Sequence, residues 1–110
     1  MNERQLCNQI IEFLNYQGAV YCWRVNSGMM KSEYQGKERM IRLAQAGTSD
    51  ILGIMRPNGQ MICIEVKLPK TRSTVTRLQQ EYLDKMKSYG ALTGVATSCE
   101  EALDLINGAS

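Results

Sequence analysis

The sequence predicts an α/β fold in which helices flank a mixed β-sheet, with elements in the order α-β-β-β-α-β-α. Two apolar runs, within residues 50–55 and 60–68, lie on either side of the turn-forming stretch Arg56-Pro57-Asn58-Gly59 and indicate a β-hairpin. A helical pattern and a short apolar strand follow the hairpin, which gives a β-α-β crossover and a parallel strand pair. Amphipathic helices at both ends of the chain can cover the sheet.

The first part of the chain predicts a helix, a strand and a connecting segment. Residues 3–16 form a helix that Gly18 ends, because apolar side chains recur there at helical spacing: Leu6, Ile10, Phe13 and Leu14. Residues 19–26 are rich in Val, Tyr and Trp, which predicts a strand. Residues 27–47 contain three glycines and mixed charges, and both a mobile loop and a small hairpin fit them.

The helix after the hairpin has two candidate caps, Thr76 and Ser73, and ends at Gly90. Its predicted apolar face consists of Leu78, Tyr82, Met86 and Tyr89.

A strand over residues 92–97 and a final helix complete the predicted order. Ser98 and Glu101 have the spacing of a capping box, and this helix runs through Leu103 and Ile106 to Gly108.

Composition limits the class of protein. At 110 residues the chain fits one domain, residues 1–110, and its 44% hydrophobic and 22% charged residues are ordinary globular values. No apolar run approaches the roughly 20 residues needed to cross a bilayer, and the first residues lack the apolar core of a secretory signal. We therefore expect a soluble protein of the cytoplasm with no membrane partner.

The chain contains no histidine and four scattered cysteines, Cys7, Cys22, Cys63 and Cys99. The missing histidine excludes Ser-His-Asp chemistry, imidazole zinc sites and nucleases with a histidine base. No two cysteines have CxxC spacing, so we expect reduced thiols in the core. Any catalysis must use carboxylates, lysine and amides, with or without a metal ion.

Charged residues interrupt the apolar pattern at the open end of the hairpin. On the second strand, Glu65 and Lys67 share a face, because side chains alternate along a strand. A register centred on the turn places Ile51 opposite Glu65 with Asp50 beside it, so the two carboxylates should meet.

Two carboxylates on a partly buried sheet repel each other unless a cation or a shared proton relieves them. A divalent ion bound by hard oxygen ligands would relieve the repulsion between both carboxylates. Water bound to such an ion becomes acidic enough to supply hydroxide near neutral pH, and hydroxide can attack a phosphodiester. Lys67 could then orient that water or stabilise charge on the phosphate. An exposed Glu65–Lys67 ion pair, with Asp50 as a turn residue, is the alternative.

The stretch "GTSDILGI", followed by "NGQMICIEVK" and "TRLQQEYLDKMKSYGALTGVATS", resembles the VRR-NUC family of the PD-(D/E)XK nuclease superfamily, especially its small stand-alone phage members. Its signature is an aspartate, then Glu-x-Lys, here Asp50 and, after fourteen residues, "EVK" at 65–67. The resemblance extends from Glu3 to about Ile106. The chain lacks a Val-Arg-Arg triplet, so we take no substrate preference from the larger members.

The resemblance implies a set of catalytic residues and a Mg²⁺ (or Mn²⁺) cofactor. Asp50, Glu65 and the Val66 carbonyl correspond to the metal ligands, Lys67 to the catalytic lysine and Gln79 to the family's helix glutamine. Two acids on the first helix compete for one further position. Glu3 lies on the apolar side of the helix and is preferred, whereas Glu12 points away from the apolar stripe and stays in reserve.

Basic residues gather in two segments of a chain whose net charge is only +2. Lys67, Lys70, Arg72 and Arg77 lie in a run without acids, and Lys31, Lys37, Arg39 and Arg42 lie in a run with two glutamates. Local contact with a polyanion and a solvated face both fit this pattern.

For a nuclease, the predicted DNA contacts flank the acids or follow the first strand. They are Arg24, Asn26, Ser27, Lys31, Arg42, Lys70, Arg72 and Arg77. None has an evident way of reading bases, so we expect recognition of DNA shape, with binding that weakens steeply as salt increases.

The predicted function is a metal-dependent endonuclease for branched or Holliday-junction DNA in a bacterial or phage-infected cell. The family's small members resemble resolvases, and cutting two symmetric strands requires a homodimer with two-fold symmetry. Two alternatives are a catalytically silent DNA-binding or replication-accessory module and a sequence-specific restriction-type endonuclease.

Overall fold

The computed structural model describes residues 1–25, 29–42 and 45–108 and contains the predicted mixed sheet flanked by helices. The main sheet has the strand order β1 (Val20–Arg24), β4 (Ile51–Met55), β5 (Gln60–Val66) and β6 (Leu92–Ala96). β1, β4 and β5 pair antiparallel, and β5 pairs parallel with β6. The crossover between β5 and β6 carries a 3₁₀ turn, η1 (Pro69–Thr74), and a helix, α2.

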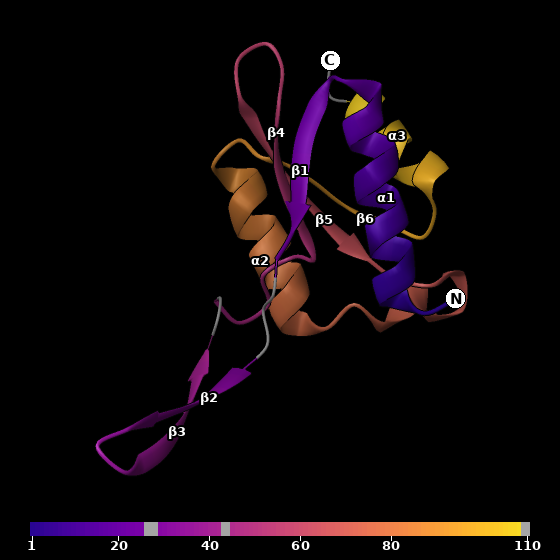
Figure 1. Cartoon of the computed structure of the whole chain (residues 1–110). Coiled ribbons are helices and arrows are strands. Elements are labelled where there is room, and N and C mark those ends of the chain that lie inside the picture. Colours follow the sequence, from indigo (N-terminus) through magenta and orange to yellow (C-terminus); the bar gives the residue numbers. More distant parts are fainter. Residues whose placement is uncertain (26–28, 43–44, 109–110) are drawn as a thin grey trace.

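The helices form layers on the two faces of this sheet (Figure 1). α1 (Glu3–Gln17) and α3 (Cys99–Asn107) pack on each other and on one face, and α2 (Arg77–Ser88) packs against β5 and β6 on the other. Gly18 ends α1 with φ +79°, as predicted. In the part of the chain that the structure describes, we find no helix with the length and apolar character to cross a membrane.

The core lies between the sheet and the α1/α3 layer. Its central pair is Ile51 and Ile64, which are cross-strand partners with 0% and 1% exposure. α3 approaches the sheet closely at Gly94, where a Cβ would lie 2.6 Å from a methyl of Leu105. Further buried side chains include Ile10, Leu14, Val20, Cys22, Ile62, Val66, Ala96 and Ala102.

The hairpin is present, but its predicted register is wrong by one residue. Ile51 lies opposite Ile64 and not opposite Glu65. The turn holds four residues, Arg56 to Gly59, with Gly59 at φ +75°, so Met55 pairs directly with Gln60. Continuing this register by one step sets Asp50 directly opposite Glu65.

The predicted apolar face of α2 is also partly wrong. Leu78 is 56% exposed and Tyr89 is 82% exposed, whereas Leu83 is buried. Tyr82 and Met86 are half-buried, as predicted. Together with Gln79 and Leu83 they make up the side of α2 that meets the sheet, where Tyr82 lies beside Ser49 and Cys63. Thr76, and not Ser73, caps the helix, because Ser73 belongs to η1.

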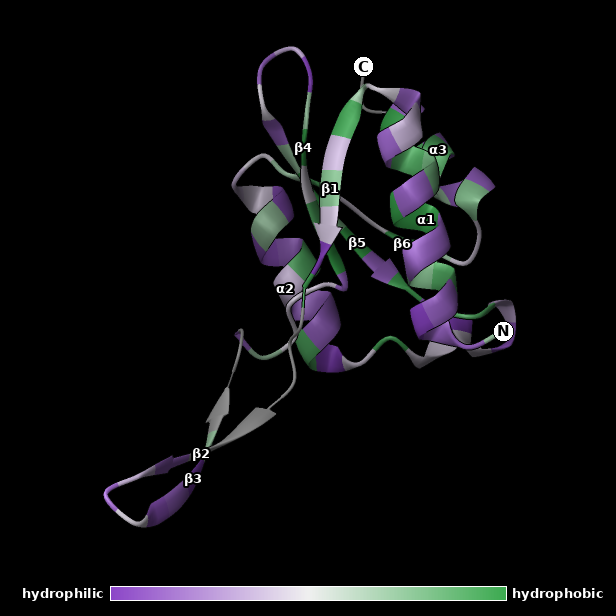
Figure 2. Cartoon of the chain, in the orientation of Figure 1, coloured by the Kyte–Doolittle hydropathy of each residue, from purple (hydrophilic) through white to green (hydrophobic). Residues whose placement is uncertain are grey.

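The segment that fitted either a loop or a hairpin is a hairpin in the structure. Among the residues that the structure describes, β2 (Met29–Tyr34) pairs with β3 (Lys37–Arg42) alone, and together they form a second sheet that projects from the body as an arm (Figure 1). The outer part of this arm is hydrophilic (Figure 2).

Candidate active site

Asp50 and Glu65 meet where β4 begins and β5 ends. Asp50 is half-buried, and its Oδ2 accepts a 2.8 Å hydrogen bond from the backbone N–H of Val66. The Glu65 side chain is only 2% exposed. Its Oε2 is buried and has no hydrogen-bond partner among the residues that the structure describes. A buried carboxylate oxygen in this condition needs a proton or a cation.

The surroundings of Glu65 strongly favour its neutral form. Burial, the Asp50 carboxyl, with which a protonated Glu65 can share its proton, and repulsion by the Asp50 charge raise the pKa of Glu65 to about 9, and the nearby charge of Glu3 adds to this. The Lys67 ammonium lowers the pKa of Glu65, but by less. Two neighbouring carboxyl groups that cannot both be charged without a counter-ion form a site for a shared proton or for a cation.

Gln79 reaches this pair from the first turn of α2. Its Nε2 donates a 3.1 Å hydrogen bond to Glu65 Oε1, and its Oε1 accepts a 2.9 Å hydrogen bond from the N–H of Thr76. The same amide therefore caps the helix and fixes the orientation of the glutamate.

Glu3, and not Glu12, is the acid of α1 that lies near the pair. Glu3 is half-buried, lines a cleft with Asp50, and accepts a 3.3 Å hydrogen bond from Thr71 Oγ1 of η1. Glu12 is exposed and borders a different groove, beside Phe13 and Tyr16. The structure thus brings together Glu3, Asp50, Glu65, Lys67 and Gln79 from four separate segments.

A cleft of about 200 Å³ opens to one side of Asp50. Arg24 at the end of β1 is exposed and lies on its wall. Burial and the Asp50 charge raise the pKa of the neighbouring Cys7 thiol to about 12, so this cysteine stays protonated and serves as packing. The cleft is lined by Glu3, Arg4, Cys7, Arg24, Val25 and Asp50.

Of the remaining predicted DNA contacts, Lys70 and Arg72 belong to η1 and Arg77 begins α2. Lys67 is 8% exposed, whereas Lys70 is exposed beside it on η1. Arg77 is exposed and pairs with Glu81 at 2.8 Å. Lys31 and Arg42 lie on the arm, but their side chains, like all of Asn26 and Ser27, are outside the described part of the structure.

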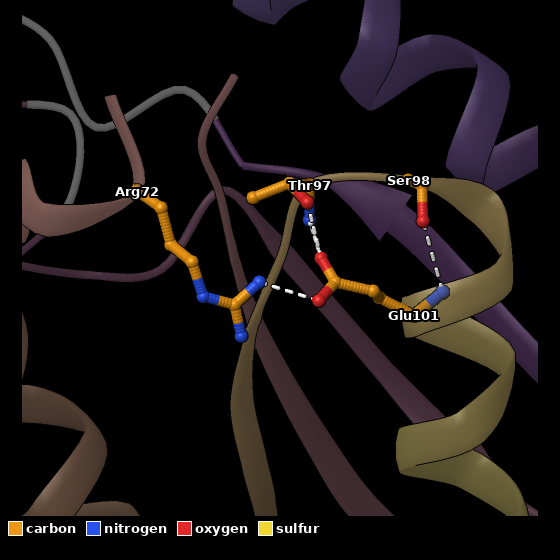
Figure 3. Close-up of polar contacts among 4 residues, drawn as sticks. All are labelled: Arg72, Thr97, Ser98 and Glu101. Atoms are coloured by element: carbon orange, nitrogen blue, oxygen red, sulfur yellow. Dashed lines mark hydrogen bonds and ion pairs between the residues drawn. The ribbon is translucent and has the colours of Figure 1, made fainter. Parts of the chain in front are cut away.

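Arg72 is held by another part of the chain. It forms an ion pair with Glu101 of α3, and Glu101 also accepts hydrogen bonds from the N–H and the hydroxyl of Thr97 (Figure 3). Ser98 caps α3 by accepting from the Glu101 N–H at 3.1 Å (Figure 3). The Thr97 hydrogen bonds and Arg72 lower the pKa of Glu101, which is charged at neutral pH. The Arg72–Glu101 pair therefore ties η1 to α3.

The donor set fits a divalent cation. Asp50 and Glu65 supply hard carboxylate oxygens, and Val66 follows Glu65 with a backbone carbonyl that can complete part of a shell. Within the ranges that the structure describes, no three acidic, cysteine or histidine side chains converge into a metal cluster. Mg²⁺ binds by one or two carboxylates and keeps several waters, so it does not require three.

Sequence reasoning missed Thr71 as part of this site. Thr71 Oγ1 donates to Glu3 and accepts a 3.1 Å hydrogen bond from the Leu68 N–H, so it links α1 to the end of β5. Pro69 after the strand is a signal for a tight turn, but the contact with Glu3 depends on how α1 packs, and no local pattern predicts that.

No protein-family model matches this chain, and no curated protein sequence matches it.

Proposed function

We propose that this protein is a divalent-metal-dependent endonuclease of the VRR-NUC type, with a PD-(D/E)XK core, that cuts branched DNA such as a Holliday junction. The observation that carries the proposal is the buried Glu65 Oε2, which has no partner in the described structure and lies within reach of Asp50. A module that only binds DNA gains nothing from two clustered carboxyl groups, since their net negative charge repels phosphates.

In this proposal Asp50, Glu65 and the Val66 carbonyl hold one Mg²⁺ or Mn²⁺. The ion supplies a positive charge for the phosphate and lowers the pKa of water. Asp50 is positioned for this role by the Val66 N–H, and Glu65 by Gln79. The orientation of each carboxyl group is thus fixed before any ion binds, which favours tight binding of the ion.

Lys67 and Glu3 have supporting roles. The Lys67 ammonium lies close to Glu65 and can stabilise the extra negative charge that develops on a phosphate during hydrolysis. Glu3, on the cleft side of Asp50, can accept a hydrogen bond from the attacking water and orient it.

Phosphates of the DNA backbone would contact the basic side chains around the cleft. Arg24 lies on the cleft wall and Lys70 follows the end of β5, so both can reach a backbone that passes Asp50. Arg77, at the start of α2, is a third candidate. These contacts do not read bases, which is consistent with recognition by shape.

A homodimer would present two such sites to a four-way junction. α2 covers β5 and β6, and apolar side chains of β1 and β4 stay exposed: Tyr21, Trp23 and Ile54. The rings of Tyr21 and Trp23 pack with centroids 5.7 Å apart. This uncovered sheet face supports a second copy as partner.

Light scattering of the wild type and of Trp23→Ser tests the proposed homodimer. A wild type that stays monomeric with and without junction DNA would disprove the homodimer.

Cleavage of a substrate panel tests the proposed function. Wild type, Asp50→Ala and Glu65→Gln are incubated with linear, flapped and four-way DNA in Mg²⁺, Mn²⁺ or EDTA. We expect cutting of the four-way DNA by the wild type only, and only with metal. The control Asp104→Asn, an exposed acid of α3, should cut normally. A wild type that binds branched DNA and never nicks it would establish the catalytically silent module instead.

A further inference from the structure

The arm formed by β2 and β3 has no packing partner of its own in the described structure. It belongs to the connection between β1 and β4 and projects away from the main sheet (Figure 1), and none of the helices or strands of the main sheet packs extensively on it. An isolated two-stranded hairpin is only marginally stable in water. A contact outside the chain would therefore stabilise the arm.

The described residues that flank the arm in the chain lie near Asp50. Before the arm, the N–H of Val25 donates a 2.8 Å hydrogen bond to the backbone carbonyl of Asp50. After it, Thr48 Oγ1 donates to the carbonyl of Gln45 at 2.5 Å, and the buried Ser49 precedes Asp50 directly. The arm therefore enters and leaves the body of the protein close to the proposed metal site in the sequence.

The turn at the tip keeps the two strands of the arm close together. Gln35 has φ +52° and Gly36 has φ +74°, the two positive values that a two-residue hairpin turn requires. Positive φ is unfavourable for a residue such as Gln35. The chain accepts this strain and forms a narrow projection with two distinct faces.

The two faces near the tip differ in charge. Tyr34 and Lys37 are cross-strand partners, and Arg39 lies on the same face two residues along the strand. Glu33 and Glu38 are partners on the opposite face. Near the tip, one face is thus basic and has an aromatic ring that is 65% exposed, and the other face carries the two glutamates.

We propose that the arm is a nucleic-acid clamp, in which Lys37 and Arg39 contact phosphates and Tyr34 stacks on an unpaired base. Exposed rings on basic surfaces bind single-stranded bases by stacking, and branch points offer such bases. This inference rests on the proposed function for the identity of the substrate.

The length of the arm limits how much DNA it can contact. Six residues per strand, at about 3.4 Å per residue, give the arm a length of about 20 Å, which corresponds to about six base pairs of duplex. We expect the arm to protect a stretch of DNA of about that length.

Binding in EDTA tests the clamp without any cleavage. Labelled four-way junction and linear duplex are titrated with wild type, Tyr34→Ala, the double variant K37A/R39A and a control, K85A/K87A. The control removes the same charge from the far end of α2. All substituted side chains are exposed, and thermal melts check that each variant folds.

K37A/R39A should bind both substrates about tenfold more weakly, and the slope of log affinity against log salt should fall by about 2. Tyr34→Ala should lose about tenfold on the junction and little on the duplex. The control should keep nearly wild-type binding.

Two results would overturn the clamp: wild-type affinity and salt slope in both arm variants, or no binding of either DNA by the wild type. A loss of binding that light scattering traces to conversion of dimer into monomer would overturn it too and assign the arm to a second copy. A wild type that binds through the arm and never cuts leaves the clamp intact and removes only the nuclease proposal.

Discussion

The side-chain amide of Gln79 joins the first turn of α2 to the buried acid Glu65. Its Nε2 donates to Glu65 Oε1 at 3.1 Å, while its Oε1 accepts from the N–H of Thr76 at 2.9 Å. Because both ends of the amide are used, its orientation is fixed by two partners at once. The position of α2 and the orientation of Glu65 therefore depend on each other.

Replacing Gln79 with Glu should separate these two roles. Glutamate preserves the capping box, since it still accepts from Thr76, but it cannot donate to Glu65 and adds a further carboxylate beside it. We expect DNA cleavage to fall at least tenfold, with a fold like that of the wild type by circular dichroism. Gln80→Glu is the control, because Gln80 is exposed and bonds to Asp84. Equal cleavage by both variants would contradict the role of Gln79.

The stability of the metal-free protein should fall as pH rises. The folded-state pKa of Glu65, about 9, lies above its ordinary value of 4.5, so between these values the folded state keeps a proton that the unfolded state releases. The stabilisation is complete below about pH 4.5 and is lost as pH rises towards about 9. Melts in EDTA between these limits measure this effect.

Two comparisons make the pH experiment specific. Glu65→Gln, which is neutral at every pH, should show a flatter curve. Excess Mg²⁺ should restore stability most at the upper end of the range, because the ion replaces the proton between the two carboxyl groups. A wild-type curve that does not change with pH, or that matches Glu65→Gln, would refute the coupling of Asp50 and Glu65.

The sequence predicted the layers of the fold because its signals are local. Apolar spacing, the Pro57-Asn58-Gly59 turn and the cap at Ser98 each depend on a few neighbouring residues. The arm also has a local signal in Gln35-Gly36, but these residues do not form one of the usual hairpin dipeptides, which left the loop open as an alternative.

What the sequence could not predict depends on packing. The one-residue register error followed from how many residues the turn holds, and it decided whether Asp50 lies opposite Glu65 or beside it. The face of α2 was misjudged because Leu78 fits the apolar spacing yet stays exposed, while Gln79 occupies the side that meets the sheet. A polar residue at a site can thus take a place that the pattern assigns to an apolar one.

Glu3 should matter for cleavage and Glu12 should not. Glu3 lies on the cleft that contains Asp50 and is bound by Thr71, whereas Glu12 borders another groove. Glu3→Gln should slow cleavage about tenfold or more, because the glutamine cannot take up a proton from water. Glu12→Gln should cut at the wild-type rate, and the reverse result would move the helix acid to Glu12. Single-turnover rates with four-way DNA measure both.

Replacing either Arg72 or Glu101 should change the stability little, and the two replacements should differ in their effect on DNA binding. Their ion pair is solvent-exposed, so Arg72→Ala and Glu101→Gln should each lower the free energy of unfolding by less than about 1 kcal/mol. If Arg72 also contacts phosphates, only Arg72→Ala should weaken DNA binding, by several-fold, because Glu101→Gln leaves the guanidinium in place. Equal binding by the two variants would limit Arg72 to tying η1 to α3.

Gly47 should be the most sensitive glycine near the site. It has φ +81°, and a Cβ there would lie 2.4 Å from the carbonyl oxygen of Leu78 in the backbone of α2. Gly47→Ala therefore combines an unfavourable φ with a backbone clash, and we expect a loss of about 2–4 kcal/mol in unfolding free energy. Because the clash pushes α2 from the loop that leads to Asp50, the Gln79–Glu65 contact should weaken as well.

Gly59→Ala is the matched control, since Gly59 has φ +75° and nothing within 4 Å of the added atom. This variant should lose only about 1–2 kcal/mol in unfolding free energy. Urea denaturation gives both values, and equal losses would show that α2 does not pack tightly against Gly47.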